Sequence, residues 1–351
     1  MSTAIEPSTQ QLSATPAVAT ERKATSLILR AREFGIFGVL FLFVLFTSIA
    51  QPRFLSLQNI KFILIDTTVF ALLAIGETLV IVSRNVDLSV GSVLGVAAFV
   101  SSNLYQIDPG ISIVVVFAVG IGVGLACGLG NGLLVAFGKV PSLVVTLATL
   151  YIIRGLDVLI VGGNQVVANA LPSSFLAVAS GSVFGIPVIS IVVGAMVLLA
   201  AYYLRNFRSG RDLYAIGSNP AAARLVGIPT SKRVLIAFVI SGALAGLAGV
   251  IWASYYGTIN STAGNGYELQ VVAAVVVGGV AIFGGSGSVV GAAIGALLLN
   301  TINSALYVLG VSAFWDQAIA GLLLLVAISL DKGIASYLAK VLRGRSRNHG
   351  A

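Results

Sequence analysis

Ten apolar stretches, each close to the length that crosses a lipid bilayer, constrain this chain more than any other feature. A membrane-spanning helix needs about 20 consecutive apolar residues. Hydrophobic residues make up 58% of the 351 residues and charged residues only 9%, against about 25% charged residues in soluble domains. We therefore predict an all-α polytopic membrane protein with about ten transmembrane helices. The predicted spans are 34–50, 62–82, 88–105, 111–137, 142–161, 188–204, 234–256, 269–283, 289–309 and 314–330.

Two of these boundaries are ambiguous in the sequence. Charged residues break one apolar run at 84–87, and glycines interrupt another at 278–287. Irregular backbone at membrane depth is tolerated where protein buries it, so either segment can be a re-entrant turn. Residues 91–98 also resemble 287–294, and each follows a break. An internal repeat and the shared glycine and alanine composition of membrane helices both explain this match.

The basic residues, which give a formal net charge of +8, gather in three short regions. These regions are 22–32, 205–233 and 332–347, whereas 234–330 contains no Lys or Arg. Basic clusters at the ends of apolar blocks are typical of cytoplasmic segments of membrane proteins, so this charge does not indicate nucleic-acid binding. With ten crossings, both termini and the 205–233 loop are predicted to be cytoplasmic.

The chain outside the apolar blocks is short. Residues 1–33 are rich in Ser, Thr, Ala and Pro, and we predict a disordered cytoplasmic extension there. No signal-peptide cleavage pattern follows the first apolar run, which we interpret as a retained span. The predicted organisation is this extension, one transmembrane domain at 34–332 that includes the 205–233 loop, and a basic cytoplasmic tail at 333–351.

The 205–233 loop contains the pattern of one short, rigid helix at 217–227. Asn219 suits the N-cap position, Pro220 the first turn, and Gly227 the stop signal. A rigid helix on a cytoplasmic loop predicts a docking surface for a partner, with an ordinary connector as the alternative. The residues assigned to this surface are Gly217, Ser218, Asn219, Pro220, Ala222, Ala223, Arg224, Leu225 and Gly227.

Polar residues inside the apolar blocks are candidates for a substrate path, because polar and ionisable groups are costly within a membrane. Asp87 before Ser89 suits a helix N-terminus, so a structural cap is the favoured alternative there. Arg154 and Asp157 can share a helix face as an ion pair, and asparagines can bridge helices by hydrogen bonds. The candidate path residues are Asn85, Asp87, Asn131, Arg154, Asn300 and Asn303.

The sequence contains no pattern for nucleotide hydrolysis or metal catalysis. The glycines at 278–287 are not followed by the Lys-Ser/Thr pair of a phosphate-binding loop. His349 is the single histidine of the chain, so no H-E-x-x-H site exists. We therefore predict no catalytic residue, no metal site and no cofactor in this chain.

Several motifs occur in a fixed order along the sequence. They are Asn-Val-Asp-Leu-Ser-Val-Gly at 85–91, Gly-Asn-Gly at 130–132, Lys-Val-Pro-Ser at 139–142, Ile-Arg-Gly-Leu at 153–156, Tyr-Ala-Ile-Gly-Ser-Asn at 214–219, Ala-Ala-Arg-Leu at 222–225, Ala-Ala-Val-Val-Val-Gly-Gly at 273–279 and Phe-Gly-Gly-Ser-Gly-Ser at 283–288. In this combination the chain resembles the membrane-spanning permease subunit of ribose-type ABC sugar importers, over roughly residues 34–332.

The resemblance implies a subunit that moves a small sugar by alternating access in the bacterial inner membrane. The implied partners are a separate ABC ATPase with its ATP and magnesium, a periplasmic sugar-binding protein, and a second permease copy or paralogue. The helix at 217–228 would be the coupling helix that sits in a groove of the ATPase. Implied substrates are ribose-type pentoses, deoxyhexoses such as rhamnose, and autoinducer-2. The sequence at 315–321 weakly favours the rhamnose and autoinducer-2 relatives.

Two other functions stay open at the level of sequence. An ion-coupled secondary transporter would need a buried carboxylate relay, for which Glu77, Asp87 and Glu268 are available. A membrane scaffold without transport would use the short helix only to bind a partner.

Overall fold

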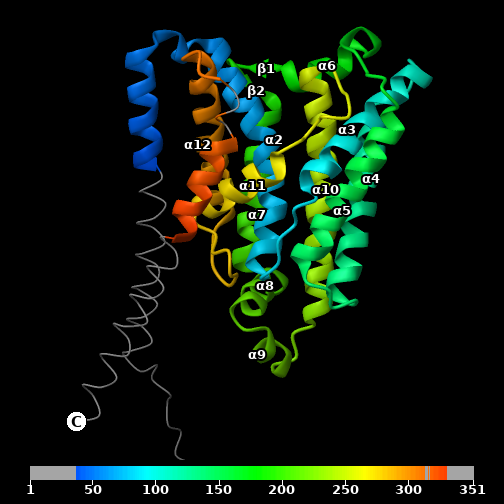
Figure 1. The fold of residues 1–351 in the computed structure, drawn as a ribbon, viewed down its shortest axis with the longest axis vertical. Helices are drawn as coiled ribbons and strands as arrows, with labels where there is room; N and C mark the ends of the chain where they lie inside the picture. The colour runs from blue at the N-terminus through cyan, green and yellow to red at the C-terminus, as the bar shows by residue number, and fades with distance from the viewer. Residues whose placement is uncertain (1–36, 313–314, 316, 330–351) are drawn as a thin grey trace, which may run out of the picture.

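This computed structural model describes residues 37–312, 315 and 317–329. Within them, a helix lies in each of the ten predicted apolar stretches (Figure 1). The predicted all-α class is confirmed, and the proposed 1–33 extension and 333–351 tail lie outside the described residues. The ten helices are Phe37–Ala50, α2 (Leu57–Val82), α3 (Val90–Ile107), α4 (Ile113–Ala136), α5 (Ser142–Val161), α7 (Val188–Asn206), α10 (Thr230–Tyr256), α11 (Tyr267–Val277), α12 (Val289–Val308) and Gln317–Ser329.

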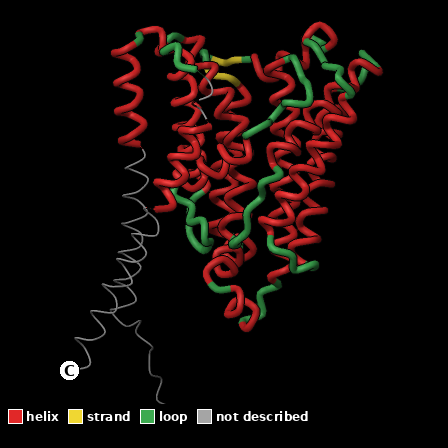
Figure 2. The backbone as a smooth tube through the Cα atoms, in the orientation of Figure 1, coloured by secondary structure: helices red, strands yellow, loops and turns green. Residues whose placement is uncertain are grey.

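Short elements connect these helices at the two ends of the bundle. Figure 2 shows a single small pair of strands among the helices of the described part, and this pair is an antiparallel hairpin. The hairpin lies at the end of the bundle opposite to α9 (Figure 1). The connecting elements are η1 (Pro52–Leu55), η2 (Ala168–Ala170), α6 (Ser173–Ser180), β1 (Ser182–Val183), β2 (Ile186–Pro187), α8 (Arg208–Ser218) and α9 (Pro220–Leu225).

Seven helices in the described part are long and apolar enough to cross a membrane by themselves: α2, α3, α4, α5, α7, α10 and α12. The predicted span at 269–283 is wrong as a complete crossing. Its helix, α11, has only 11 residues and ends at Val277, where Gly278 and Gly279 interrupt it. The helices Phe37–Ala50 and Gln317–Ser329 are also shorter than a span, and each borders residues outside the description.

The break after α2 is the non-helical first part of a crossing that α3 completes, so it is not a re-entrant turn. Residues 83–89 turn back along α2 to α3, which begins part-way up the bundle (Figure 1). The backbone N–H of Val86 donates to Ser142 Oγ at 3.2 Å, and Thr146 Oγ1 donates to the carbonyl of Val86 at 3.2 Å. Side chains of α5 therefore satisfy this non-helical backbone, as the membrane interior requires.

A second segment enters the bundle from the opposite end. Residues 257–266 lead from the end of α10 back to α11, which lies near the middle of the bundle in Figure 1. The two resembling segments, 91–98 and 287–294, each cover the start of a helix that follows a break, α3 and α12.

The helices α2 and α10 form the centre of the bundle. Eighteen of the 26 residues of α2 are buried, whereas α7 buries three of its 19. The helix α2 packs against α7, α10, α11 and α12, and α10 packs against α2, α3 and α4. The outer faces of α5 and α7 are apolar and exposed, which suits lipid or the helices of a partner.

Glycines allow α4 and α10 to approach until their backbones touch. Gly120, Gly124 and Gly128 recur every four residues along α4 and face Gly242 and Gly246 of α10. A Cβ atom at Gly124 would meet the carbonyl oxygen of Gly242. Small residues at this spacing are the usual means of close helix packing in membranes.

Replacing Gly124 with Ala should therefore destabilise the bundle by about 1–3 kcal/mol, because an added methyl group has no space at a backbone contact. Thermal unfolding of the purified protein in detergent measures the change. Gly122→Ala is the matched control on the same helix, since nothing lies within 4 Å of a Cβ added there. Equal unfolding temperatures for the two variants would contradict the packing assignment.

Candidate functional site

The predicted docking helix is present as α9, with the predicted caps. Asn219 Oδ1 accepts hydrogen bonds from the backbone N–H groups of Ala221 at 3.1 Å and Ala222 at 3.0 Å. Pro220 occupies the first turn, and Gly227 follows the helix with a φ of +78°. The local signals in the sequence were therefore sufficient to place both ends of this helix.

The predicted single helix at 217–227 is nevertheless wrong in its first residues. Gly217 and Ser218 form the last turn of the preceding helix, α8, and the extended backbone of Asn219 separates the two helices. A Cβ atom at Gly217 would meet the carbonyl oxygen of Val82 and the backbone nitrogen of Gly285. Gly217 is thus a packing residue against the bundle and lies outside α9.

The helix α9 presents an apolar tip to solvent. Leu225 is 88% exposed and Val226 is 73% exposed, while Ala223 on the opposite face is buried. Arg224 is exposed beside this tip. Exposed apolar side chains next to a cation on a rigid helix are suited to binding another protein.

Two side-chain contacts hold α8 against the bundle. Arg233 of α10 donates to Asp212 Oδ2 through Nε and Nη2, both at 2.9 Å. Tyr214 Oη donates to the carbonyl of Gly287 at 2.9 Å, and burial raises the pKa of Tyr214 to about 12, so that the hydroxyl stays protonated at physiological pH. The backbone N–H of Gly285 also donates to the carbonyl of Val82 at 2.9 Å. The helix α8 therefore contacts Val82, the last residue of α2, and the glycine segment at 278–288.

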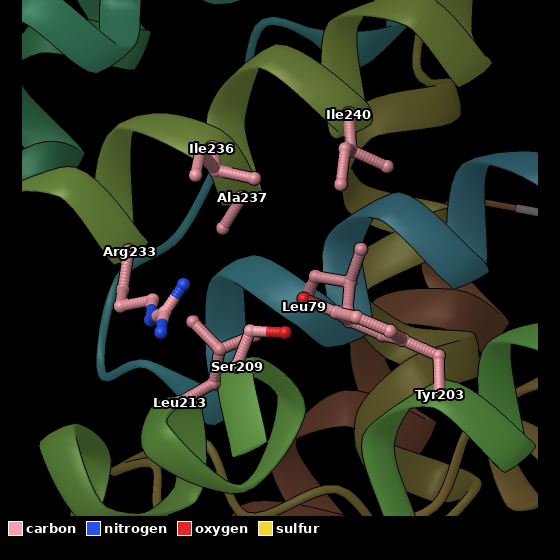
Figure 3. A pocket seen from close by; sticks show the side chains of 8 residues that line it. All are labelled: Leu79, Tyr203, Ser209, Leu213, Arg233, Ile236, Ala237 and Ile240. Carbon is pink, nitrogen blue, oxygen red and sulfur yellow. The ribbon is translucent and has the colours of Figure 1, made fainter. Parts of the chain in front are cut away.

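A small pocket of about 10 Å³ lies between α8 and the central helices (Figure 3). That volume is close to the space of one water molecule, so the pocket is too small for a sugar. Its lining residues are Leu79, Tyr203, Ser209, Leu213, Arg233, Ile236, Ala237 and Ile240.

Two of the predicted path residues meet in one buried polar network. Asp87 Oδ1 accepts from the backbone N–H of Ser89 at 3.0 Å and from its hydroxyl at 2.6 Å, and Ser241 Oγ of α10 donates to Asp87 Oδ2 at 3.3 Å. Asn131 Nδ2 of α4 donates to Ser89 Oγ at 2.8 Å. Glu77 Oε1 accepts from the backbone N–H of Asp87 at 3.1 Å. Asp87 lies two residues before Ser89, the N-cap residue of α3, which makes no side-chain capping hydrogen bond, and the network links this turn to α2, α4 and α10.

The remaining path residues lie elsewhere. Asn85 is half-buried and donates locally to the carbonyl of Ser83 at 3.0 Å. Asn300 of α12 is buried, and neither polar atom of its side chain has a hydrogen-bond partner within the described residues. Asn303 is half-buried one turn further along the same helix. The structure therefore does not assemble the six predicted residues into one site.

Arg154 joins α5 to the segment that precedes α11. Its Nη1 lies 3.7 Å from Asp157 Oδ2, which confirms that the two share a helix face. The shorter contacts of Nη1 are with the carbonyl oxygens of Ala263 at 2.7 Å and Ser261 at 3.3 Å. These carbonyl contacts, about 110 residues away in sequence, could not be predicted from the local pattern.

The first turns of α3 and α11 meet close to this arginine. A Cβ atom at Gly91 would contact the carboxylate of Glu268 and the carbonyl of Gly264, and one at Gly95 would lie 3.1 Å from Arg154 Nη1. Glycine at these two positions therefore makes room for charged groups between helix ends. Helix N-termini and charges at such a junction are typical of polar sites in transporters.

Sequence reasoning missed a group of aromatic residues around Asp66. Tyr256 Oη donates to Asp66 Oδ1 at 3.1 Å, and Trp252 Nε1 donates to the hydroxyl of Tyr267 at 3.1 Å. The spacing of Trp252, Tyr255 and Tyr256 in the last turns of one span was the available signal. No group of three or more His, Cys, Asp or Glu suited to a metal ion occurs among the residues that the structure describes.

A sequence model of the permease component of branched-chain amino acid transport systems matches residues 59–328. The chain belongs to this permease family. It is 35% identical to the autoinducer 2 import system permease protein LsrC of Enterobacter sp. (strain 638), over 89% of this chain and 90% of the relative. LsrC of Escherichia coli O9:H4 is 36% identical over 88% and 89%, and LsrC of Yersinia pseudotuberculosis serotype O:3 is 36% identical over 85% and 83%. No solved structure matches the chain.

These relatives confirm the resemblance to the ribose-type permease group. Together with the seven helices of spanning length, they identify the chain as a multi-pass membrane subunit of a transport system. The description of the family and the names of the relatives refer to different cargoes, so family membership leaves the cargo of this chain undecided.

Replacing Arg154 with Ala should destabilise the protein by about 3–5 kcal/mol, because Asp157 has no exposed surface and would be left as an unpaired buried charge. Thermal unfolding in detergent is the measurement. Adding Asp157→Asn to this variant removes the unpaired charge and should recover part of the loss. Full stability of the single variant would show that the pair and the carbonyl contacts are unimportant.

Proposed function

We propose that this chain is the translocation subunit of an ABC importer for a small sugar or a related furanosyl compound. The observation that carries the proposal is the capped, apolar-tipped helix α9, which follows α8, while α8 contacts the end of α2 and the glycine segment at 278–288. The substrate classes are a ribose-type pentose, a deoxyhexose such as rhamnose, or autoinducer 2. The autoinducer 2 import function named for the relatives supports this choice.

The proposed partners follow from what the chain contains. A separate ATPase supplies ATP and magnesium chemistry, since the sequence has no phosphate-binding loop. A periplasmic sugar-binding protein delivers the substrate, and a second permease copy or paralogue completes the pathway in the inner membrane. The basic 205–233 loop supports a cytoplasmic position for α9, with both termini on the same side. Nucleic acid has no role here.

In this mechanism the ATPase moves α9, and α8 transmits the movement. The contacts of Tyr214 with Gly287 and of Gly217 with Val82 connect α8 to the ends of α2 and to the segment before α12. Rigid-body displacement of α8 would therefore shift both segments together and reorient α3 and α12. Polar groups near the starts of α3 and α12 would then line a path that opens in turn to the two sides of the membrane. These groups include Asp87, Asn131 and Arg154, and the further contacts would be Asn85, Asn300 and Asn303.

The decisive experiment is transport by the complete importer in proteoliposomes, with the ATPase and the binding protein present. We expect uptake of a radiolabelled sugar that requires ATP and that stimulates ATP hydrolysis. Uptake driven by a proton or sodium gradient without ATP would overturn the proposal in favour of secondary transport. Uptake of leucine in place of sugar would assign the cargo named in the family description, and a complex without any uptake would be a scaffold.

Replacing Leu225 with Glu should weaken binding of the ATPase by about 30-fold or more, because the variant places a charge at the centre of the proposed contact. Co-purification and titration with the labelled ATPase measure this effect. Phe184→Glu is the matched control, since Phe184 is fully exposed on the hairpin turn at the other end of the bundle. Unchanged ATPase affinity in the Leu225 variant would exclude α9 as the docking helix.

A further inference from the structure

An aromatic group encloses the carboxylate of Asp66 on α2. Tyr256, the last residue of α10, donates from its hydroxyl to Asp66 Oδ1 at 3.1 Å. The ring of Trp252 lies 4.5 Å from that of Tyr256 between centroids, tilted by 36°. The ring of Tyr255 lies 5.0 Å from Tyr256, almost edge-on at 72°.

A second pair of rings extends this group to α11. Trp252 Nε1 donates to the hydroxyl of Tyr267 at 3.1 Å, and the ring of Tyr267 lies 4.6 Å from that of Phe70. Three helices thus contribute to one continuous surface of rings with a carboxylate in it. We call this surface the aromatic site and define it as Asp66, Phe70, Trp252, Tyr255, Tyr256 and Tyr267.

The aromatic site combines buried and exposed residues. Phe70 is 2% exposed and Asp66 is 7% exposed, whereas Tyr256 is 38% exposed and Trp252 and Tyr255 are partly exposed. An acidic residue within a membrane-spanning helix is costly, and such residues almost always face the bundle interior or a water-filled path. The carboxylate, which accepts from Tyr256, places a polar acceptor beside the rings.

The aromatic site lies nearer to one end of the bundle than to the other. The helix α10 begins next to α9 and ends at Tyr256, so the site lies towards the end of the bundle remote from α9 (Figure 1). Tyr267 is followed by Glu268, whose carboxylate faces Gly91 in the first turn of α3. The rings therefore lead from the outer side towards the junction of α3 and α11.

We propose that the aromatic site binds the sugar as it enters the permease, an inference that rests on the proposed import function. A sugar ring has apolar C–H faces, which aromatic rings cover, and hydroxyl groups, which can donate to the carboxylate of Asp66. A branched-chain amino acid would also need a partner for its carboxylate. The aromatic site contains no Lys or Arg, and 234–330 contains none either. The chemistry thus favours a neutral polyhydroxylated ligand.

Fluorescence of Trp252 offers a direct test on the full chain. The chain has two tryptophans, so Trp315→Phe leaves Trp252 as the single reporter. In lipid nanodiscs, titration with D-ribose, L-rhamnose and autoinducer 2 should give a saturable change for at least one of them, and L-leucine should give none. Asp66→Asn should weaken this response by about tenfold or more, since a hydrogen bond to a charged acceptor is lost. A response to leucine alone, or to no sugar, would overturn the proposal.

Transport by the complete importer separates this proposal from the function on which it rests. Tyr256→Phe keeps the ring and removes the hydroxyl that orients Asp66, so sugar uptake should fall while complex assembly and basal ATP hydrolysis stay unchanged. Tyr151→Phe, on the exposed face of α5, is the matched control. If the unmodified importer takes up sugar with ATP and the Asp66 and Tyr256 variants do so equally well, the aromatic site is wrong and the import function stands. If the unmodified importer takes up no sugar, both fail.

Discussion

Every backbone polar group at membrane depth must find a partner within the protein, and this requirement governs the whole structure. It explains why the apolar stretches are helices, and it also limits where the helices can be interrupted. The segment 83–89 enters the bundle where Ser142 and Thr146 of α5 bond to Val86. The glycine segment at 278–288 enters where Gly285 bonds to Val82. Interruptions therefore occur only against neighbours that satisfy them.

The same requirement places the interrupted segments against α8. Because Gly217 of α8 packs against Val82 and Tyr214 of α8 donates to Gly287, a movement of α8 changes contacts at the end of α2 and in the segment before α12. Close packing strengthens this coupling, since the glycine contact between α4 and α10 leaves little freedom inside the bundle. In the proposed mechanism, such a rigid connector would transmit a displacement of α9 to the end of α2 and to the segment before α12.

Polar chemistry is distributed along the bundle in separate groups. The network around Asp87 lies near the end of α2 that contacts α8, Arg154 lies at the junction of α3 and α11, and Asp66 lies nearest the opposite end. Each group is tied to at least two helices whose relative position would change during alternating access. In the proposed mechanism this arrangement would offer a substrate successive polar contacts, whereas a single deep site would hold it tightly.

The sequence by itself determined the all-α membrane class, the approximate positions of the apolar helices, the caps of α9 and the spacing of the Arg154–Asp157 pair. These features depend on composition and on contacts within a few residues. Tertiary structure alone decided that Gly217 belongs to α8, that Arg154 binds the carbonyl of Ala263, and that Tyr256 meets Asp66 across 190 residues of sequence. Such pairings depend on which helices become neighbours. In a bundle of similar apolar helices, close backbone approach at glycines helps to decide which helices become neighbours. The sequence of one helix does not state which other helix it will meet.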